Sequence, residues 1–357
     1  MKCINRIDIQ KKKEEMAEIT EPMEPKTEKK ETGRKKPGVL AALIIATAFF
    51  TGCGGKSFEM AYSPDYPVSS FRMDSPSESD DMAEPFAMDL CVVDKDVTAE
   101  TDVDLSHSEA AGLFCRDDKQ TIYAKNVHEQ LAPASLTKIM TASVALKYGS
   151  PDTMLTASAN VKITEAGAQL SGIKEGDQMT LTQALHLLLI NSGNDAAVLI
   201  AEGIGGSVEN FCDMMNKEAL ALGATNTHFS NPHGLTAEDH YVTAYDMYLI
   251  FNEALEYQLI NEIIQMPSYT TVYHDREGRE KEITVNNSNQ YLQGAETAPG
   301  TVTVIGGKTG TTKAAGRCLI LLSRDASGKS YISVILRSET GETLYGGMTD
   351  LLGEIKN

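Results

Sequence analysis

A hydroxyl and an amine stand three residues apart in the tetrad Ser135–Lys138. Pro133 and Ala134 precede it, and a proline with a small residue suits a first helical turn. Residues i and i+3 share one face of a helix, so these two side chains can meet. A lysine whose pKa is lowered by burial or by nearby positive charge can take the proton of a serine. The tetrad therefore predicts nucleophilic catalysis by Ser135 with Lys138 as base, although an isolated pair of this kind is more often solvated surface.

Two further motifs strengthen this hypothesis. The triad Ser192–Asn194 reads Ser-Gly-Asn and lies in a break between two apolar helical runs, and Lys308–Gly310 reads Lys-Thr-Gly and follows the strand-like run 301–305. A Ser-x-x-Lys tetrad, a Ser-Asp-Asn-type triad and Lys-Thr-Gly, in this order, are the motifs of penicillin-binding proteins and class A β-lactamases. In this chain Gly193 replaces the middle Asp of the triad.

The match continues beyond these motifs. Longer tracts also resemble the low-molecular-mass D-alanyl-D-alanine carboxypeptidases, namely 133–142, 194–197, 231–235 and 315–319, and Asn287–Asn289 resembles an Asn-Thr-Asn tract of the same family. The resemblance covers about residues 110–340. The chain is therefore identified, by resemblance, as a member of the serine-type peptidase family S11.

The resemblance implies an acyl-enzyme mechanism on peptidoglycan stem peptides that end in D-Ala-D-Ala, with a role in cell-wall biogenesis and cell shape. Ser135 is expected to attack the carbonyl between the last two D-alanines, and Lys138 to take its proton. Apolar Ile139 and Met140, together with Lys308, are expected to lower the pKa of Lys138. β-Lactams are expected to inhibit covalently, and no cofactor or metal is implied.

The other motif residues receive roles in the same way. Ser192 is expected to relay a proton between Lys138 and the leaving amine, and Asn194 to orient the amide of the substrate. Lys308 and Thr309 are expected to bind the terminal carboxylate, which explains why such an enzyme trims chain ends. The backbone amides of Ser135 and Thr311 are expected to form the oxyanion hole.

Charge and cysteine usage narrow the class of protein. Residues 37–357 carry 21 Lys and Arg against 42 Asp and Glu, which argues against a nucleic acid partner. The cysteines beyond the amino-terminal segment lack the CxxC spacing of a zinc site, and the seven histidines contain no HExxH; these cysteines are Cys91, Cys115, Cys212 and Cys318. The sequence leaves open whether Cys91 and Cys115 form a disulfide.

The amino terminus has the features of an export signal. A basic cluster at 34–36 precedes twelve uncharged residues, 39–50, which as a helix would reach about 18 Å, short of a hydrocarbon core of about 30 Å. Residues 51–55 resemble a bacterial lipobox in which Cys53 is lipidated. We therefore expect 1–53 to be an export signal and the protein to be extracytoplasmic and anchored to the membrane of a bacterial envelope. Phe50 and the long segment before the basic cluster leave cleavage open, and an uncleaved anchor is the alternative.

The remaining chain predicts a tether followed by one catalytic domain. Residues 54–108 mix Ser, Pro, Asp, Glu and Met without sustained periodicity, which is typical of a disordered acidic tether. Residues 109–357 are expected to form the carboxypeptidase domain. Because only 47 residues follow Gly310, the β-rich second domain of several family members is not expected.

Local patterns in the domain predict an α+β fold, an antiparallel sheet flanked by helices with an inserted all-helical subdomain, and the resemblance implies that this fold is of the β-lactamase/transpeptidase type. Strands are expected near 110–116, 121–124, 301–307, 317–323 and 330–336, a second hairpin near 269–285, and a last helix from 342. Thr180 and Gln183 predict a capping box before a central helix, and Asn194 or Asp195 is expected to cap the next one.

Two rival functions remain. A class A-like β-lactamase needs a glutamate that activates water for deacylation, and the nearest tract, Glu256–Asn261, departs from its Glu-x-x-Leu-Asn pattern. A lipoprotein that binds peptidoglycan or penicillin without turnover would keep the same motifs. Release of free D-alanine from a stem peptide separates an enzyme from such a binding protein.

The lipobox generates a prediction about Cys53. Stable anchoring needs the two or three acyl chains of a bacterial lipoprotein, because one chain binds only marginally. Metabolic labelling with a fatty-acid analogue should therefore label the wild-type protein and leave Cys53→Ser unlabelled. An unlabelled wild type, or equal label on the variant, would show that the lipobox interpretation is wrong.

Overall fold

The computed structural model describes residues 87–98, 103–300 and 302–356. The predicted export segment 1–53 with Cys53, and most of the predicted tether, lie outside these residues. No helix among the described residues has the length and apolar character needed to cross a membrane.

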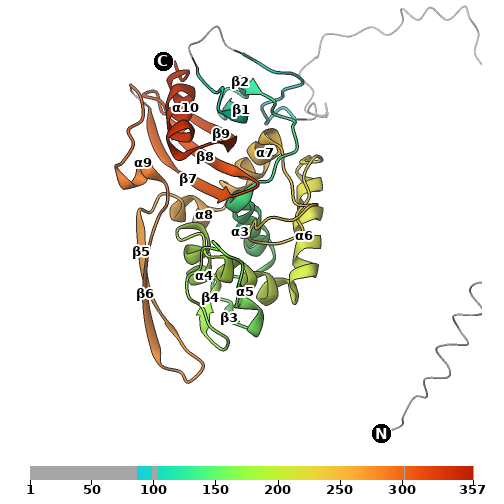
Figure 1. The fold of residues 1–357 in the computed structure, drawn as a ribbon, viewed down its shortest axis with the longest axis vertical. Coiled ribbons are helices and arrows are strands. Elements are labelled where there is room, and N and C mark those ends of the chain that lie inside the picture. Colours follow the sequence, from blue (N-terminus) through green and yellow to red (C-terminus); the bar gives the residue numbers. More distant parts are fainter. Residues whose placement is uncertain (1–86, 99–102, 301, 357) are drawn as a thin grey trace, which may run out of the picture. The chain divides into compact units, whose positions relative to one another are not determined.

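A five-stranded antiparallel sheet forms the centre of the domain (Figure 1). Its strands lie in the order β2-β1-β9-β8-β7, so the first hairpin pairs with the last strand of the chain. Ala110 of β1 is opposite Leu336 of β9, 226 positions later in the sequence. The bounds are β1 Ser108–Cys115, β2 Gln120–Lys125, β7 Thr303–Thr312, β8 Gly316–Arg324 and β9 Ser330–Ser338. The predicted α+β architecture, with a sheet built from both ends of the domain, is confirmed.

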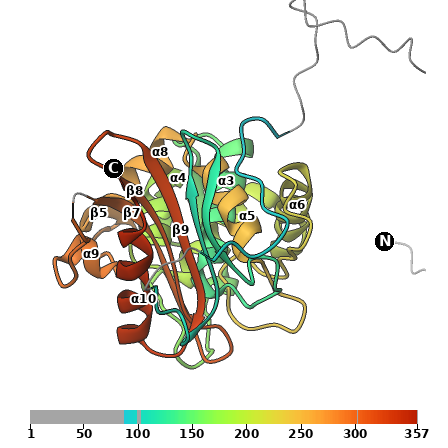
Figure 2. The same cartoon turned by 90° about the horizontal axis from the view of Figure 1, so that it is seen from above.

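Helices cover both faces of this sheet (Figure 2). Apolar side chains of β1, β8 and β9 point alternately to the two faces, as a pleated strand requires. On one face Leu319, Leu321 and Ile335 pack with α10 (Gly341–Gly353). On the other face the core includes α3 (Thr137–Tyr148) and α7 (Ala244–Ala254).

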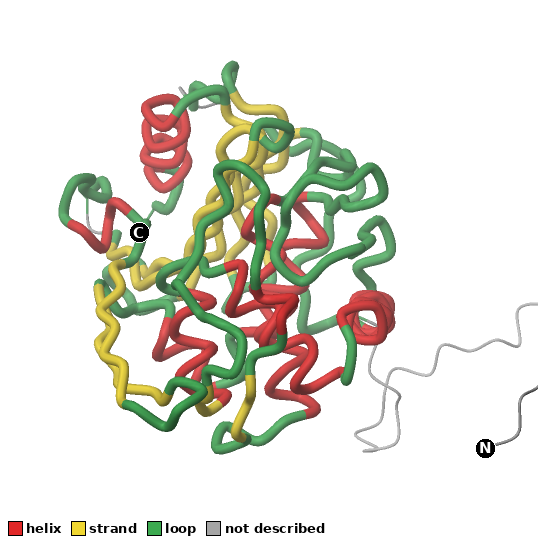
Figure 3. The backbone as a smooth tube through the Cα atoms, turned by 60° about the horizontal axis from the view of Figure 1, so that its bottom comes forward, coloured by secondary structure: helices red, strands yellow, loops and turns green. Residues whose placement is uncertain are grey.

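A helical block is inserted in the chain between β2 and β7, and Figure 3 shows helices gathered beside the strands of the sheet. It contains α4 (Leu181–Leu189), α5 (Asn194–Gly205) and α6 (Val208–Ala221). The predicted capping box of Thr180 and Gln183 begins α4, and α4 is buried almost all round. The predicted cap of α5 is wrong. Gly193 is the N-cap and makes no side-chain bond. The Asn194 and Asp195 side chains bind Lys138 and the loop 171–173 instead.

A second sheet, in the order β3-β4-β5-β6, borders the helical block and ends in a long hairpin (Figure 1). The predicted hairpin is confirmed in full register from Ser268↔Asn286 to His274↔Glu280. The strands are β3 Met154–Thr156, β4 Gln178–Thr180, β5 Ser268–His274 and β6 Glu280–Asn286. The remaining helices are α8 Gln258–Ile263 and α9 Gln290–Gln293, with 3₁₀ turns η2 Ala134–Leu136 and η3 Ala159–Val161.

The domain begins earlier than the sequence predicted. Residues 87–98 and 103–108 had been assigned to the tether, yet Cys91, Val93 and Leu105 are buried in the core. The backbone N–H of Cys91 donates to the Tyr248 hydroxyl, 2.9 Å away. Composition averaged over the predicted tether hides these few apolar residues, which explains the error at position 109.

The cysteine pair left open by the sequence is not bridged. Cys91 and Cys115 are free and buried, and the Cys91 thiol donates to the Cys115 carbonyl at 3.2 Å. Cys212 and Cys318 are free and buried as well.

Candidate active site

The first motif forms at the junction of two helical segments. Ser135 lies in the 3₁₀ turn η2, and Lys138 lies in the first turn of α3. The Nζ atom of Lys138 lies 2.9 Å from Ser135 Oγ. The spacing in the sequence therefore brings hydroxyl and amine together as expected.

Lys138 is completely buried and surrounded by hydrogen-bond acceptors. Besides Ser135, its Nζ contacts Asn194 Oδ1 at 2.7 Å and the carbonyl oxygen of His233 at 2.6 Å. Burial lowers the pKa of Lys138 well below its ordinary value, the positive charge of Lys308 lowers it further, and the Asp195 carboxylate opposes both effects. The predicted direction of this pKa shift is confirmed, with burial as the main cause.

The neighbours of Lys138 differ in what they can do. An amide oxygen and a carbonyl oxygen only accept hydrogen bonds, whereas a serine hydroxyl can donate or accept. A neutral lysine has two N–H groups and one lone pair. Asn194 and the His233 carbonyl take the two N–H groups, so the lone pair faces the Ser135 hydroxyl. This geometry suits removal of the serine proton.

The second and third motifs are joined by a hydrogen bond between Lys308 and Ser192. Lys308 Nζ donates to Ser192 Oγ at 3.0 Å and to the carbonyl of Thr309 at 2.9 Å. Burial lowers the pKa of Lys308 to about 7. Ser192 has φ +62°, a left-handed conformation that costs a non-glycine residue of order 1 kcal/mol. The hydrogen-bond partner of Ser192 is thus Lys308, whereas the expected partner was Lys138. No hydrogen bond joins Ser192 to Lys138 in the described part of the chain.

These groups border a cleft of about 310 Å³ that contains both polar and small residues. Its lining residues are Ser135, Gly167, Gln169, Asn191, Ser192, Asn286, Ser288, Thr309, Gly310 and Thr311. Thr309 and Ser288 share a hydroxyl–hydroxyl hydrogen bond at its edge. Lys308, only 1 % exposed, lies behind this lining. A molecule in the cleft would therefore contact the hydroxyls of Ser288 and Thr309 rather than Lys308.

Strand β7 approaches the nucleophile closely because residue 310 is a glycine. A Cβ atom at Gly310 would lie 3.0 Å from the backbone nitrogen of Ser135 and 3.1 Å from Ala134 Cβ. The sequence had placed the Lys-Thr-Gly motif after a strand. In the structure the motif is inside β7, which continues to Thr312. Gly310 thereby packs against the Ser135 turn, and Ser135, Gly310 and Thr311 all line the cleft.

Several site residues were not predicted as such. The backbone carbonyl of His233 binds Lys138, and Ser288, Gln169 and Asn191 line the cleft. The sequence signal for His233 and Ser288 is the resemblance of the tracts 231–235 and 287–289 to the family. Asn194 was expected to orient substrate, but its Oδ1 binds Lys138.

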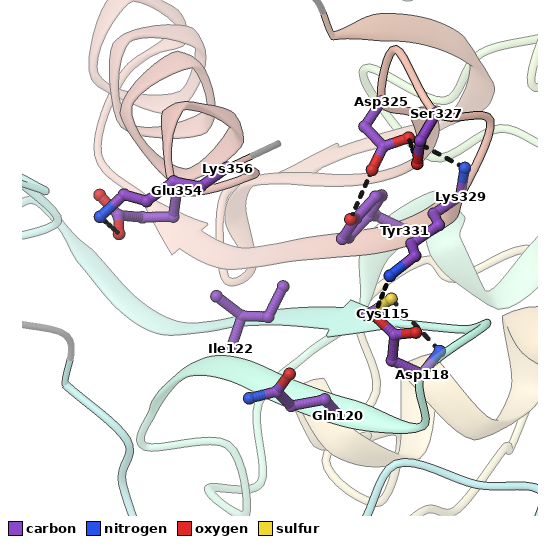
Figure 4. Close-up of a pocket in the computed structure, with 10 residues that line it drawn as sticks. All are labelled: Cys115, Asp118, Gln120, Ile122, Asp325, Ser327, Lys329, Tyr331, Glu354 and Lys356. Carbon is purple, nitrogen blue, oxygen red and sulfur yellow. Dashed lines mark hydrogen bonds and ion pairs between the residues drawn. The ribbon is translucent and has the colours of Figure 1, made fainter.

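A different pocket, at the far end of the sheet, is a weaker candidate (Figure 4). Its charged groups already bind each other. Asp325 accepts from the hydroxyls of Tyr331 and Ser327, and Lys329 forms an ion pair with Asp118 at 2.6 Å. None of the three sequence motifs reaches this pocket.

The chain is similar to curated D-alanyl-D-alanine carboxypeptidases. The chain is 37% identical over 259 residues to D-alanyl-D-alanine carboxypeptidase DacF of Bacillus subtilis, covering 70% of this chain and 62% of that protein. It is 34% identical over 236 residues to D-alanyl-D-alanine carboxypeptidase DacC of Escherichia coli, covering 64% and 56%. The chain thus spans about 60% of the length of these relatives.

Solved structures share the fold. The D-alanyl-D-alanine carboxypeptidase of Mycobacterium tuberculosis aligns with a TM-score of 0.64 and 26% identity over 74% of this chain and 97% of that one. The Streptomyces K15 DD-transpeptidase aligns with a TM-score of 0.65 and 25% identity over 70% and 96%. The family profile of peptidase S11, D-alanyl-D-alanine carboxypeptidase, matches residues 97–340. The chain belongs to the peptidase S11 family.

Proposed function

We propose that this protein is a serine-type D-Ala-D-Ala carboxypeptidase, which removes the terminal D-alanine from peptidoglycan stem pentapeptides through a Ser135 acyl-enzyme. The observation that carries the proposal is the contact set of Lys138: two pure acceptors and the Ser135 hydroxyl within 2.9 Å of one buried amine. The names of the relatives in B. subtilis and E. coli support the same substrate class.

Acylation begins with proton transfer from Ser135 to Lys138. The Ser135 oxygen bonds to the carbonyl carbon of the penultimate D-alanine, and the carbonyl oxygen becomes an oxyanion. The backbone N–H groups of Ser135 and Thr311, which border the cleft, donate to that oxygen. Lys138 can start this step because its pKa is lowered well below its ordinary value, which increases the neutral fraction of the amine.

The leaving amine must receive a proton as the C–N bond breaks. Ser192 lines the cleft and accepts from Lys308, so we assign it to pass a proton from Lys308 to the departing D-alanine. This role differs from the expected relay from Lys138. Acylation leaves the Ser135 proton on Lys138 and leaves Lys308 one proton short, so the proton must pass from Lys138 to Lys308 before Lys138 can act as the base for an attacking water.

Specificity for chain ends comes from the terminal carboxylate. Thr309 and Ser288 offer hydroxyls at the edge of the cleft, and the Lys308 ammonium lies one layer behind them. A positive charge in this low-dielectric position favours an anion and discriminates against an internal peptide bond, which has no carboxylate. β-Lactams, whose carboxylate is similarly placed, are expected to acylate Ser135.

The rival β-lactamase mechanism lacks its glutamate. None of the ten residues that line the cleft is an aspartate or a glutamate. Glu256, the nearest approach in sequence, is two-thirds exposed and forms an ion pair with Arg116 at 2.9 Å. Deacylation would therefore use Lys138 as the base for water.

We place the enzyme outside the cytoplasm, where cell-wall peptides are, with attachment to the membrane through a lipid on Cys53. The support for this placement is the basic, apolar and lipobox-like order of the amino-terminal sequence. Residues 54–86 would then join the anchor to the folded domain.

Replacement of Ser135 by alanine should abolish D-alanine release and covalent labelling by a fluorescent penicillin. Ser171 is the matched control, because Lys174 follows it at the same spacing in a loop. Ser171→Ala should retain labelling, which gel fluorescence measures. Labelling that persists in Ser135→Ala would refute the nucleophile assignment.

The two lysines predict opposite effects of pH on kcat/KM. Activity should rise with pH as Lys138 loses its proton, because only the neutral amine is a base. It should fall as pH passes about 7, because Lys308 then loses the charge that attracts the carboxylate of the substrate. Initial rates of D-alanine release between pH 5 and 10 measure both effects. A rate that rises steadily to pH 10 would contradict the role of Lys308.

Lys308→Ala should slow hydrolysis of both substrates, because Lys308 supplies the proton for the leaving amine, but it should weaken hydrolysis of a free-acid substrate much more than that of its C-terminal amide. The expected loss of kcat/KM on the acid is about 10²-fold, the order for loss of a hydrogen-bonded charged partner of about 3 kcal/mol. The wild-type protein should already act poorly on the amide. Equal losses on acid and amide would show that Lys308 does not recognise the carboxylate.

A further inference from the structure

His240 and Thr137 lie directly behind the proposed nucleophile, and the mechanism above uses neither of them. Thr137 is the first residue of α3 and is fully buried, and His240 is 3 % exposed. The His240 ring packs edge-on against Phe229, with 5.7 Å between ring centroids. Buried polar side chains are stable only when they are hydrogen-bonded, so the partners of His240 and Thr137 indicate their role.

The hydrogen bonds of His240 determine which ring nitrogen carries the proton. The backbone N–H of Ser230 donates to Nδ1 at 3.1 Å, so Nδ1 must be the acceptor. A neutral imidazole then carries its proton on Nε2. Nε2 lies 2.8 Å from Thr137 Oγ1 and donates to it. Burial lowers the pKa of His240 to about 4, which keeps the ring neutral near pH 7.

Thr137 extends this chain of hydrogen bonds to the nucleophile's neighbour. Its Oγ1 donates to the carbonyl oxygen of Ala134 at 2.9 Å. Ala134 has φ +49°, a left-handed conformation that is unfavourable for alanine. Gly234 packs so tightly on the same carbonyl that a Cβ atom there would overlap it. The Ala134 carbonyl is therefore held from two sides.

The peptide group that contains this carbonyl also contains the N–H of Ser135. A trans peptide is planar, so its C=O and N–H point in opposite directions. A fixed Ala134 carbonyl thus fixes the direction of the Ser135 N–H. The Ser135 nitrogen lies close to Gly310 of β7, and Ser135, Gly310 and Thr311 all line the cleft. A hydrogen bond accepted by the carbonyl also polarises the N–H of the same group.

We infer that His240 is a positioning residue, which acts through Thr137 to aim the Ser135 N–H at the oxyanion of the tetrahedral intermediate. This inference rests on the proposed acyl-enzyme function. Loss of an oxyanion-hole donor costs about 10²–10³ in kcat. A donor that is present but poorly aimed should cost about 10–100-fold, in kcat rather than in KM, since the oxyanion develops only in the transition state.

Two matched pairs of variants test the chain of hydrogen bonds. His240→Gln keeps an N–H group near the position of Nε2, whereas His240→Asn reaches only as far as Nδ1. Thr137→Ser keeps the hydroxyl, and Thr137→Val removes it with little change of shape. Ser143→Ala is the control, because its hydroxyl is also buried on α3 but donates to the Ile139 carbonyl, away from the nucleophile.

The measurements are kcat and KM for D-alanine release from a stem pentapeptide and from the same peptide with a thiocarbonyl at the scissile bond. Sulfur accepts hydrogen bonds weakly, so a well-aimed oxyanion hole favours oxygen over sulfur. In His240→Asn and Thr137→Val, kcat on the oxygen substrate should fall about 10–100-fold, and the oxygen-to-sulfur rate ratio should fall with it. His240→Gln, Thr137→Ser and Ser143→Ala should stay within about threefold of wild type.

An unchanged kcat in Thr137→Val, or an equal loss on both substrates, would overturn the inference. Thermal unfolding followed by circular dichroism verifies that each variant is folded. If His240→Asn does not fold, the result for Thr137→Val decides the test. A wild-type protein that neither releases D-alanine nor is labelled by penicillin would instead refute the proposed function. The two failures are therefore distinguishable.

Discussion

The site depends on one buried amine whose hydrogen-bond acceptors come from separate parts of the fold. Lys138 on α3 receives Asn194 Oδ1 from α5 and the His233 carbonyl from the loop that follows α6. If either acceptor were missing, an N–H of the neutral amine would turn toward Ser135, and the lone pair would no longer face the hydroxyl. The packing of α3 against α5 thus matters for chemistry as well as for stability. Burial supplies the second requirement, because an amine in water near pH 7 would be protonated.

The nucleophile turn is fixed by close backbone approaches on two sides. Gly310 lets β7 pass within contact distance of the Ser135 nitrogen, and Gly234 lets the loop 231–235 press on the Ala134 carbonyl. A Cβ atom at Gly234 would overlap the Ala134 carbonyl, and one at Gly310 would lie only 3.0 Å from the Ser135 nitrogen. Rigid placement of this kind suits a site in which a donor must be aimed to within a fraction of an ångström. Ala134 and Ser192, which have strained positive φ angles, lie beside and in the cleft, and strained backbone typically clusters at active sites.

Sequence predicted the side chains of the site better than its backbone. Ser135, Lys138 and Lys308 were found because their chemistry lies in the side chain and the motif spacing is specific. The His233 carbonyl was missed because every residue has a carbonyl, so nothing in a sequence marks the one that binds Lys138. The cap of α5 was mispredicted because Asn194 and Asp195 suit a helix start by local propensity, whereas tertiary contacts recruit both side chains elsewhere. The domain boundary was mispredicted because burial of Cys91 depends on Tyr248, 157 positions away.

The order of the elements along the chain has a consequence for when the protein can react. Ser135 and Lys138 precede Lys308 by about half the length of the chain, and β7 pairs with β8, which pairs with β9 near the carboxyl end. Such distant contacts form late, because closing long loops costs entropy before the contacts repay it. A nascent chain that lacks β7 lacks both Lys308, whose charge lowers the pKa of Lys138, and Gly310, which packs against the Ser135 turn. The site is therefore incomplete until β7, β8 and β9 have folded onto the earlier part of the chain.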